Sequence, residues 1–197
     1  PQSASLYQYI GQKNFLDAYA VACLGVTDSD WRLLAVNALE NMELDIARKA
    51  FIRVRDMRFI DLLNKIELLR RQGGEAGDER LCRAEVLAYQ GKYQEAAKAF
   101  AACGQMQRAI DMFSDLRQWE EAKSFANSTG GMDVKDLIRR QAEWSEELTD
   151  WKSAADMYKA AGEPLKAIRI IGGKMVEGSA PADSLRELSR SLQDHDE

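Results

Sequence analysis

The residues with the clearest chemical character in this sequence are basic side chains gathered between Asp45 and Arg71. Eight basic residues stand there against four acidic ones, a net charge of +4 in a chain whose overall charge is −5. Two interpretations are open: a docking strip for an acidic partner or a lipid headgroup, or a solvated helix surface without a binding role. The candidate strip consists of Arg48, Lys49, Arg53, Arg55, Arg58, Arg70 and Arg71.

Side chains suited to catalysis are sparse. The only histidine, His195, stands in the polar C-terminal tail, whereas a nucleophile–histidine pair needs a folded pocket. The carboxylates Glu143, Glu146 and Glu147 follow helical spacing, which is more typical of a solvated helix face than of an acid–base pair. We therefore predict no catalytic residues and a protein that is not an enzyme.

Metal and cofactor sites are not predicted either. Cys23, Cys82 and Cys103 are too widely separated to form the close pairs that structural zinc sites need. Their places in apolar patterns indicate small buried residues in a reducing, cytoplasmic compartment. The sequence Gly172-Gly173-Lys174 lacks the first glycine and the hydroxyl residue of a phosphate-binding loop, so we interpret it as a helix end.

The composition predicts a folded, helical chain. Hydrophobic residues make up 46% and charged residues 30%, and proline occurs only three times in 197 residues. The negative net charge argues against nucleic acid as a partner. We find no apolar stretch long enough to cross a bilayer, and no signal peptide.

The elements that carry these residues follow one recurring pattern. A large apolar residue is followed after three positions by alanine and after four more by another apolar residue, as in Tyr93, Ala96 and Phe100. These steps place all three side chains on one helix face, which a single helix cannot bury. The alanine lets a neighbouring helix approach closely, so helices are expected to stack. Further copies centre on Ala18, Ala47, Ala109, Ala122, Ala154 and Ala167.

The spacing of these copies decides between kinds of repeat. A regular tetratricopeptide array has a period of about 34 residues, and the alanines at 96, 109, 122, 154 and 167 do not keep it. We therefore predict an all-α fold, an irregular, tetratricopeptide-like α-hairpin solenoid. The expected domains are 1–178 for the solenoid and 179–197 for a short terminal helix and polar tail. The chain starts at Pro1 without methionine, which indicates a fragment or a processed start, and we expect a fragment of a longer array.

Glycines and capping residues set the expected helix limits. Gly11, Gly25, Gly91, Gly104 and Gly162 are predicted helix ends, and Thr27-Asp28-Ser29-Asp30 supplies N-cap oxygens. Loops are expected at 73–78 and 128–131, a frayed tail at 194–197, and an uncovered apolar face at Leu6, Tyr7 and Ile10. The predicted helices are 14–24, 30–41, 43–55, 57–71, 79–90, 92–103, 105–115, 118–127, 132–148, 150–161, 163–172 and 181–193.

Three stretches are more distinctive than the repeat pattern. They are Ala22–Trp31, Ala50–Phe59 and Ala88–Ala97. In this order and spacing they resemble the helical region of the intraflagellar transport protein 122 family, subunits of the intraflagellar transport A complex. The resemblance covers the chain from about Tyr7 to Ile171.

The resemblance implies β-propellers N-terminal to such a solenoid, and assembly with other intraflagellar transport A subunits. It further implies dynein-driven retrograde transport, transport adaptors, membrane-receptor cargo brought into cilia, and a location in cytoplasm, cilium or flagellum, and basal body. We expect this chain to be a scaffold segment of such a subunit. The alternative is a helical-repeat adaptor of the vesicle-coat or peptide-binding type.

Overall fold

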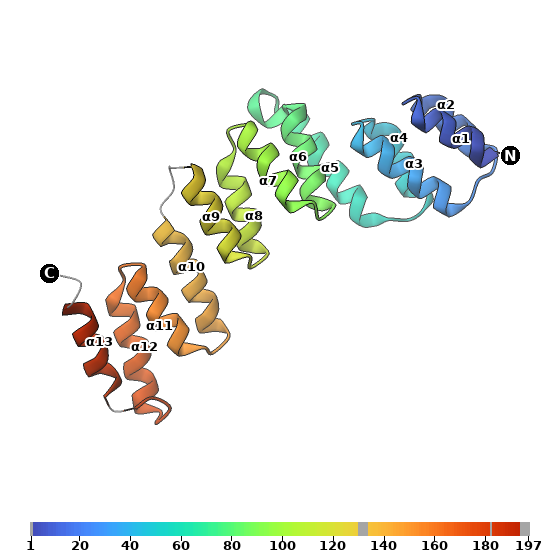
Figure 1. The fold of residues 1–197 in the computed structure, drawn as a ribbon. Coiled ribbons are helices and arrows are strands. Elements are labelled where there is room, and N and C mark those ends of the chain that lie inside the picture. Colours follow the sequence, from blue (N-terminus) through green and yellow to red (C-terminus); the bar gives the residue numbers. More distant parts are fainter. Residues whose placement is uncertain (1, 130–133, 182, 194–197) are drawn as a thin grey trace. The chain divides into compact units, whose positions relative to one another are not determined.

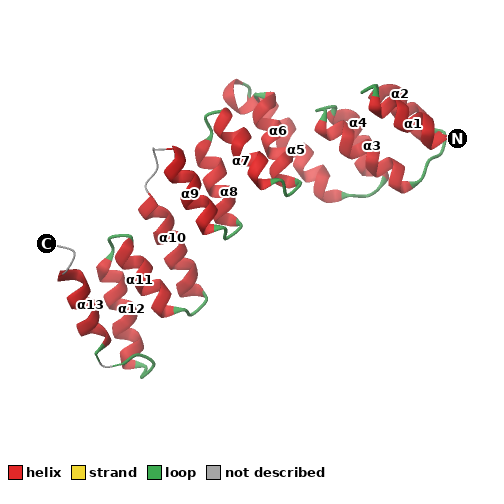
Figure 2. Cartoon of the chain, viewed as in Figure 1, coloured by secondary structure: helices red, strands yellow, loops and turns green. Residues whose placement is uncertain are grey.

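The computed structural model describes residues 2–129, 134–181 and 183–193, and most of them are helical. No strand occurs within these ranges, as Figure 2 shows. The prediction of an all-α, tetratricopeptide-like repeat is confirmed. None of the helices in the described part combines the length and apolar character needed to cross a membrane.

The chain divides into two compact units, Pro1–Ala109 and Ile110–Glu197. The helices wholly within the first are α1 (Gln2–Gly11), α2 (Phe15–Cys23), α3 (Asp28–Glu40), α4 (Leu44–Arg53), α5 (Met57–Gln72), the 3₁₀ helix η1 (Gly74–Gly77), α6 (Glu79–Tyr89) and α7 (Tyr93–Ala102). Helix α8 (Met106–Asp115) spans the boundary. The second unit continues with α9 (Trp119–Thr129), α10 (Val134–Glu147), α11 (Trp151–Ala160), α12 (Pro164–Val176) and α13 (Ser184–Gln193).

Successive helices pack as hairpins within each unit. In the first unit α1 packs on α2, α3 on α4 and α6 on α7, while α5 lies against α4 and α6 (Figure 1). In the second unit α10 packs on α11, α11 on α12 and α12 on α13. This arrangement buries one apolar face of each helix, which is what the spacing of three and four residues requires.

The recurring alanines lie where the helices touch. Each of the seven central alanines has no solvent-exposed surface, and they are Ala18, Ala47, Ala96, Ala109, Ala122, Ala154 and Ala167. Larger residues of the same pattern, such as Phe51, Phe100 and Tyr158, are 2% exposed. A methyl side chain at the contact lets the helix axes approach while its large neighbours fill the adjoining grooves.

Eight helix-to-helix connections in the described ranges share one three-residue turn with a left-handed middle residue. After α11, for example, the amide of Glu163 donates to the carbonyl of Tyr158 at 2.9 Å, which satisfies an end carbonyl of the helix. Glycine holds the middle position at Gly91, Gly104 and Gly162, and the other residues that hold it are Lys13, Met42, Arg55, Arg117 and Thr149.

These turns explain which helix ends were predicted correctly. The breaks at Gly91, Gly104 and Gly162 are confirmed. Helix α1 does end at Gly11, but Lys13 is the left-handed residue of the turn that follows. Where a residue other than glycine holds the left-handed middle position, the sequence has no glycine there from which the turn could be predicted.

The predicted capping of α3 is confirmed. The backbone amide of Asp30 donates to Oγ1 of Thr27, and the Thr27 amide donates back to the Asp30 carboxylate at 3.1 Å. This reciprocal pair satisfies amides that the first turn of a helix leaves without partners. Trp31 follows directly and is buried.

Several predicted helix limits were wrong. Helix α1 was absent from the predicted set, and its Leu6 is fully buried, so the expectation that this residue stays uncovered is incorrect. Helix α12 continues through Gly172 and Gly173 to Val176, so these glycines do not end it. The turn after α12 uses Gly178 instead.

The two expected loops have different outcomes. The segment 73–78 contains the 3₁₀ helix η1, which joins α5 to α6. Of the segment 128–131, Ser128 and Thr129 belong to the end of α9, and 130–131 lie outside the described residues. The tail 194–197, with His195, also lies outside them.

Candidate protein-docking site

The structure separates the seven candidate basic residues into three groups. Arg48 and Lys49 lie in the middle of α4, Arg53, Arg55 and Arg58 surround the α4–α5 turn, and Arg70 and Arg71 end α5. Arg70 follows Arg58 by twelve positions of α5, about 18 Å along the axis at 1.5 Å per residue. One partner of modest size therefore meets either end of α5 rather than all seven side chains together.

The first group is engaged within the protein. Arg48 on α4 pairs with Glu67 on α5 at 2.9 Å and donates to the side-chain oxygen of Asn64 at the same distance. The ammonium of Lys49 lies 5.4 Å from the ring centre of Tyr19 on α2, a cation–π contact. Both side chains contribute to packing between neighbouring helices.

Arg70 and Arg71 border a surface hollow of about 370 Å³ at the C-terminal end of α5. Glu43, Asp45 and Glu67 border the same hollow. Three carboxylates beside two guanidinium groups leave no excess of positive charge there. This end of α5 is therefore a poor match for an acidic partner.

The second group, Arg53, Arg55 and Arg58, lies at the opposite end of α5, and the structure adds to it Arg32, which sequence spacing did not indicate. Arg32 on α3 reaches Asp56 at 4.0 Å, and Arg58 reaches the same carboxylate at 3.5 Å. Arg53 approaches Asp28 at 3.9 Å. The hairpin of α3 and α4 brings Arg32 to this turn, although Arg32 precedes Arg53 by 21 positions in the sequence.

A polar centre between α1 and α3 was likewise not indicated by the sequence. The carboxylate of Asp30, buried at 3% exposure, accepts hydrogen bonds from Tyr7 at 2.5 Å, Ser3 at 2.9 Å and the Thr27 hydroxyl at 2.9 Å. The bonds from Tyr7 and then Ser3 lower the pKa of Asp30 to about 2. Because every donor comes from this chain, the centre serves to fix α1 on α3.

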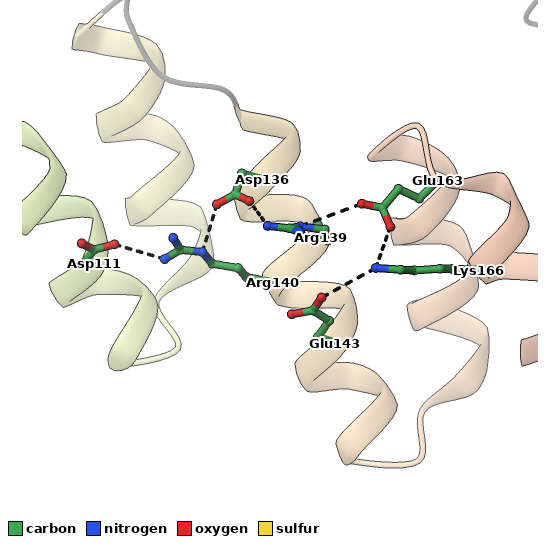
Figure 3. Close-up of polar contacts among 7 residues, drawn as sticks. All are labelled: Asp111, Asp136, Arg139, Arg140, Glu143, Glu163 and Lys166. Atoms are coloured by element: carbon green, nitrogen blue, oxygen red, sulfur yellow. Dashed lines mark hydrogen bonds and ion pairs between the residues drawn. The ribbon is translucent and has the colours of Figure 1, made fainter.

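The second unit contains an ion-pair network on three helices (Figure 3). Arg140 on α10 reaches Asp111 on α8 at 3.1 Å, and Lys166 on α12 reaches Glu143 on α10 at 3.8 Å. Arg139 contacts Asp136 within α10 and Glu163, the residue before α12, at 3.9 Å. Because the side chains are roughly 30–50% exposed, each pair adds little stability, and the network chiefly fixes how the helices align.

Two of the three glutamates near the end of α10 contact side chains of neighbouring helices. Glu143 pairs with Lys166, and Glu146 accepts a 3.1 Å hydrogen bond from the Tyr158 hydroxyl. Burial and then this bond raise the pKa of Tyr158 to about 12. Within the described residues, no three His, Cys, Asp or Glu side chains are grouped to hold a metal ion.

Comparison with known proteins gives the family context of this arrangement. The family model described as "IFT122, TPR domain" matches residues 2–191. An intraflagellar transport protein 122 homolog of Xenopus tropicalis is 48% identical over 98% of this chain, and one of Homo sapiens is 46% identical over 87%. An intraflagellar transport protein 172 homolog of Mus musculus is 28% identical over 74%.

The chain spans a small part of these relatives. It covers 16% of the Xenopus protein, 14% of the human protein and 9% of the mouse protein. The family match also reaches beyond Ile171, where the resemblance recognised from sequence ended.

Proposed function

This chain belongs to the intraflagellar transport protein 122 family, and from that premise we propose that it is a non-enzymatic scaffold segment of an intraflagellar transport A complex subunit. Its role is to hold other subunits by protein–protein contacts during retrograde ciliary transport and the admission of cargo into cilia. The observation that carries the proposal is the family match over residues 2–191.

The fold is consistent with a role in assembly. Helical hairpins bury one face of each helix and leave the opposite face and the turns open to partners, which gives a large surface for protein contacts. The polar clusters of both units are satisfied by internal partners, as at Asp30 and at Arg139. Such clusters align helices and leave the chemistry of binding to exposed side chains.

The partners that fit this proposal are other intraflagellar transport A subunits, with transport adaptors and membrane-receptor cargo as further candidates. The proposed location is the cilium or flagellum, its basal body and the adjoining cytoplasm. The name of the mouse relative, an intraflagellar transport protein 172 homolog, supports transport within cilia.

The test replaces residues 2–193 in the intact protein with a flexible Gly/Ser linker in ciliated cells. We expect the variant to lose stoichiometric subunits on purification, and transported material to accumulate at the ciliary tip because its return fails. A control carries Ala102→Leu and Ala160→Leu, at exposed positions of α7 and α11. Full subunit association and normal return transport in the linker variant would refute the proposal. If the intact protein instead co-purifies with vesicle-coat proteins, the adaptor alternative is favoured.

A further inference from the structure

Four arginine side chains gather at one end of the α3–α4–α5 stack. Arg53 and Arg55 come from the end of α4 and its turn, Arg58 from the first turn of α5, and Arg32 from α3. Figure 1 shows the start of α3 and the α4–α5 connection on the same edge of this unit. The ion pairs of Arg32 with Asp56 and of Arg53 with Asp28 tie the two places together.

These guanidinium groups retain most of their hydrogen-bonding capacity. The side chains of Arg32 and Arg53 are each 60% exposed and that of Arg58 is 78% exposed, with ion-pair distances of 3.5–4.0 Å. Arg55 is exposed, and its side chain makes no ion pair or hydrogen bond within the described residues. A guanidinium carries five N–H donors in a fork that matches a carboxylate, so each group has donors to spare.

Apolar side chains lie beside these charges. Ile52 precedes Arg53 and is 58% exposed, and Met57 precedes Arg58 and is 65% exposed. Exposed aliphatic groups beside arginine are typical of protein interfaces, where apolar burial supplies affinity and charge supplies orientation. The surface therefore suits a ligand that is both acidic and apolar.

We propose that the α4–α5 arginine patch, formed by Arg32, Arg53, Arg55 and Arg58 with Ile52 and Met57, binds an acidic, amphipathic segment of a partner protein. The inference rests on the proposed function and names the surface and the chemistry of its partner. It excludes Arg48, Lys49, Arg70 and Arg71, whose positive charge is engaged or offset inside the protein.

The small net charge of the patch favours a protein segment over an anionic membrane as its ligand. Asp28 and Asp56 lie within the patch and reduce its net charge to +2, in a chain that carries −5. Attraction to a lipid surface acts over about a Debye length and needs an uncompensated basic cluster. A bidentate contact between a guanidinium and a carboxylate acts at short range and tolerates these neighbouring acids.

The first experiment measures binding of a fluorescent twelve-residue peptide of alternating Glu and Leu to the chain, with a Gln-Leu peptide for comparison. We expect binding of the Glu peptide alone, weakened about tenfold or more in the variant Arg53→Gln/Arg55→Asn/Arg58→Gln. Asparagine at position 55 tolerates the left-handed backbone there. The matched control, Arg169→Gln/Arg186→Gln/Arg190→Gln, removes three exposed arginines of the second unit and should bind as the unaltered chain does.

Other outcomes of this experiment overturn the inference. Equal binding of the two peptides, or equal weakening by both triple variants, shows that the patch is not a specific acidic-segment site. Binding to vesicles of phosphatidylserine and phosphatidylcholine without binding of the Glu peptide assigns the surface to lipid instead.

The second experiment places a photo-crosslinking amino acid at Met57 of the intact protein in ciliated cells. Crosslinks to a protein segment rich in Asp and Glu, lost in the triple arginine variant, support the inference. Crosslinks only to lipid, or to segments without net negative charge, overturn it. If the triple variant assembles fully while the linker variant of residues 2–193 does not, the patch inference fails and the proposed function stands.

Discussion

The hydroxyl of Tyr7 on α1 donates a 2.5 Å hydrogen bond to Oδ1 of Asp30, the third residue of α3. The same carboxylate accepts from Ser3 on α1 and from Thr27 at the start of α3. One carboxylate thus joins the first hairpin to the next helix and also caps that helix. Its pKa, lowered to about 2, reports how well this junction is formed.

Replacing Tyr7 with phenylalanine should raise the pKa of Asp30 from about 2 toward its ordinary value of 3.8, because the largest cause of the shift is removed. A folded pKa below the unfolded value adds stability that is present above about pH 4 and lost as the pH falls toward 2. Between about pH 4 and pH 2, the free energy of unfolding should therefore fall less in the variant than in the unaltered protein. A carboxyl-carbon NMR titration measures the pKa directly, and Tyr9→Phe, the control, should leave it near 2.

The substitution Ala154→Leu should destabilise the chain by about 1–3 kcal/mol, because Ala154 is fully buried at a helix contact and larger side chains overpack it. Ala160→Leu in the same helix is the control, since Ala160 is exposed. Urea unfolding followed by circular dichroism measures both. Equal stability of the two variants would show that Ala154 does not mark a close helix contact.

Glu85 on α6 offers a test of ion pairing, because it accepts from Lys65 on α5 at 2.6 Å and from Arg108 on α8 at 2.7 Å. Its side chain is only 11% exposed. Glu85→Ala should cost about 1–2 kcal/mol, since both cations lose their partner but remain partly hydrated. Glu79→Ala, at an exposed pair with Arg83, should cost less than about 0.5 kcal/mol. A calorimetric comparison that gives equal losses would contradict this difference.

The substitution of glycine by alanine should have opposite effects at two positions. Gly173 lies inside α12 with no atom within 4 Å of an added Cβ, so Gly173→Ala should stabilise by about 1 kcal/mol through helix propensity. Gly162 has φ of 79° in the turn before α12, so Gly162→Ala should destabilise by about 1 kcal/mol. Thermal unfolding of both variants shows the signs, and a shared sign would refute the assignment of the turn.

Thr149 occupies the same left-handed turn position between α10 and α11, with φ of 62°. A β-branched residue is strained there, so Thr149→Gly should stabilise by about 1 kcal/mol. Lys152→Gly, at an exposed position inside α11, should instead cost about 1 kcal/mol. Chemical denaturation distinguishes the two effects, and a loss of stability in Thr149→Gly would show that the backbone is unstrained.

The sequence by itself determined the helical class and much of the helix packing. The spacing of three and four residues around Ala96 and Ala154 depends only on the helix repeat, so it predicted the buried face before any partner helix was known. The capping pair of Thr27 and Asp30 was equally readable, because the two residues are three apart. The family resemblance rested on the order of the residues within three short stretches. The match of the family model to residues 2–191 confirmed it.

Only the tertiary structure decided which side chains from distant segments share a surface. Arg53, Arg55 and Arg58 lie at one end of α5 and Arg70 and Arg71 at the other. Arg32 joins the first of these ends through the α3–α4 hairpin. The left-handed turn at Thr149 lacked the glycine that marks such turns elsewhere. The physical reason is that periodicity and caps are local along the chain, whereas a docking surface depends on how the helices pack against one another.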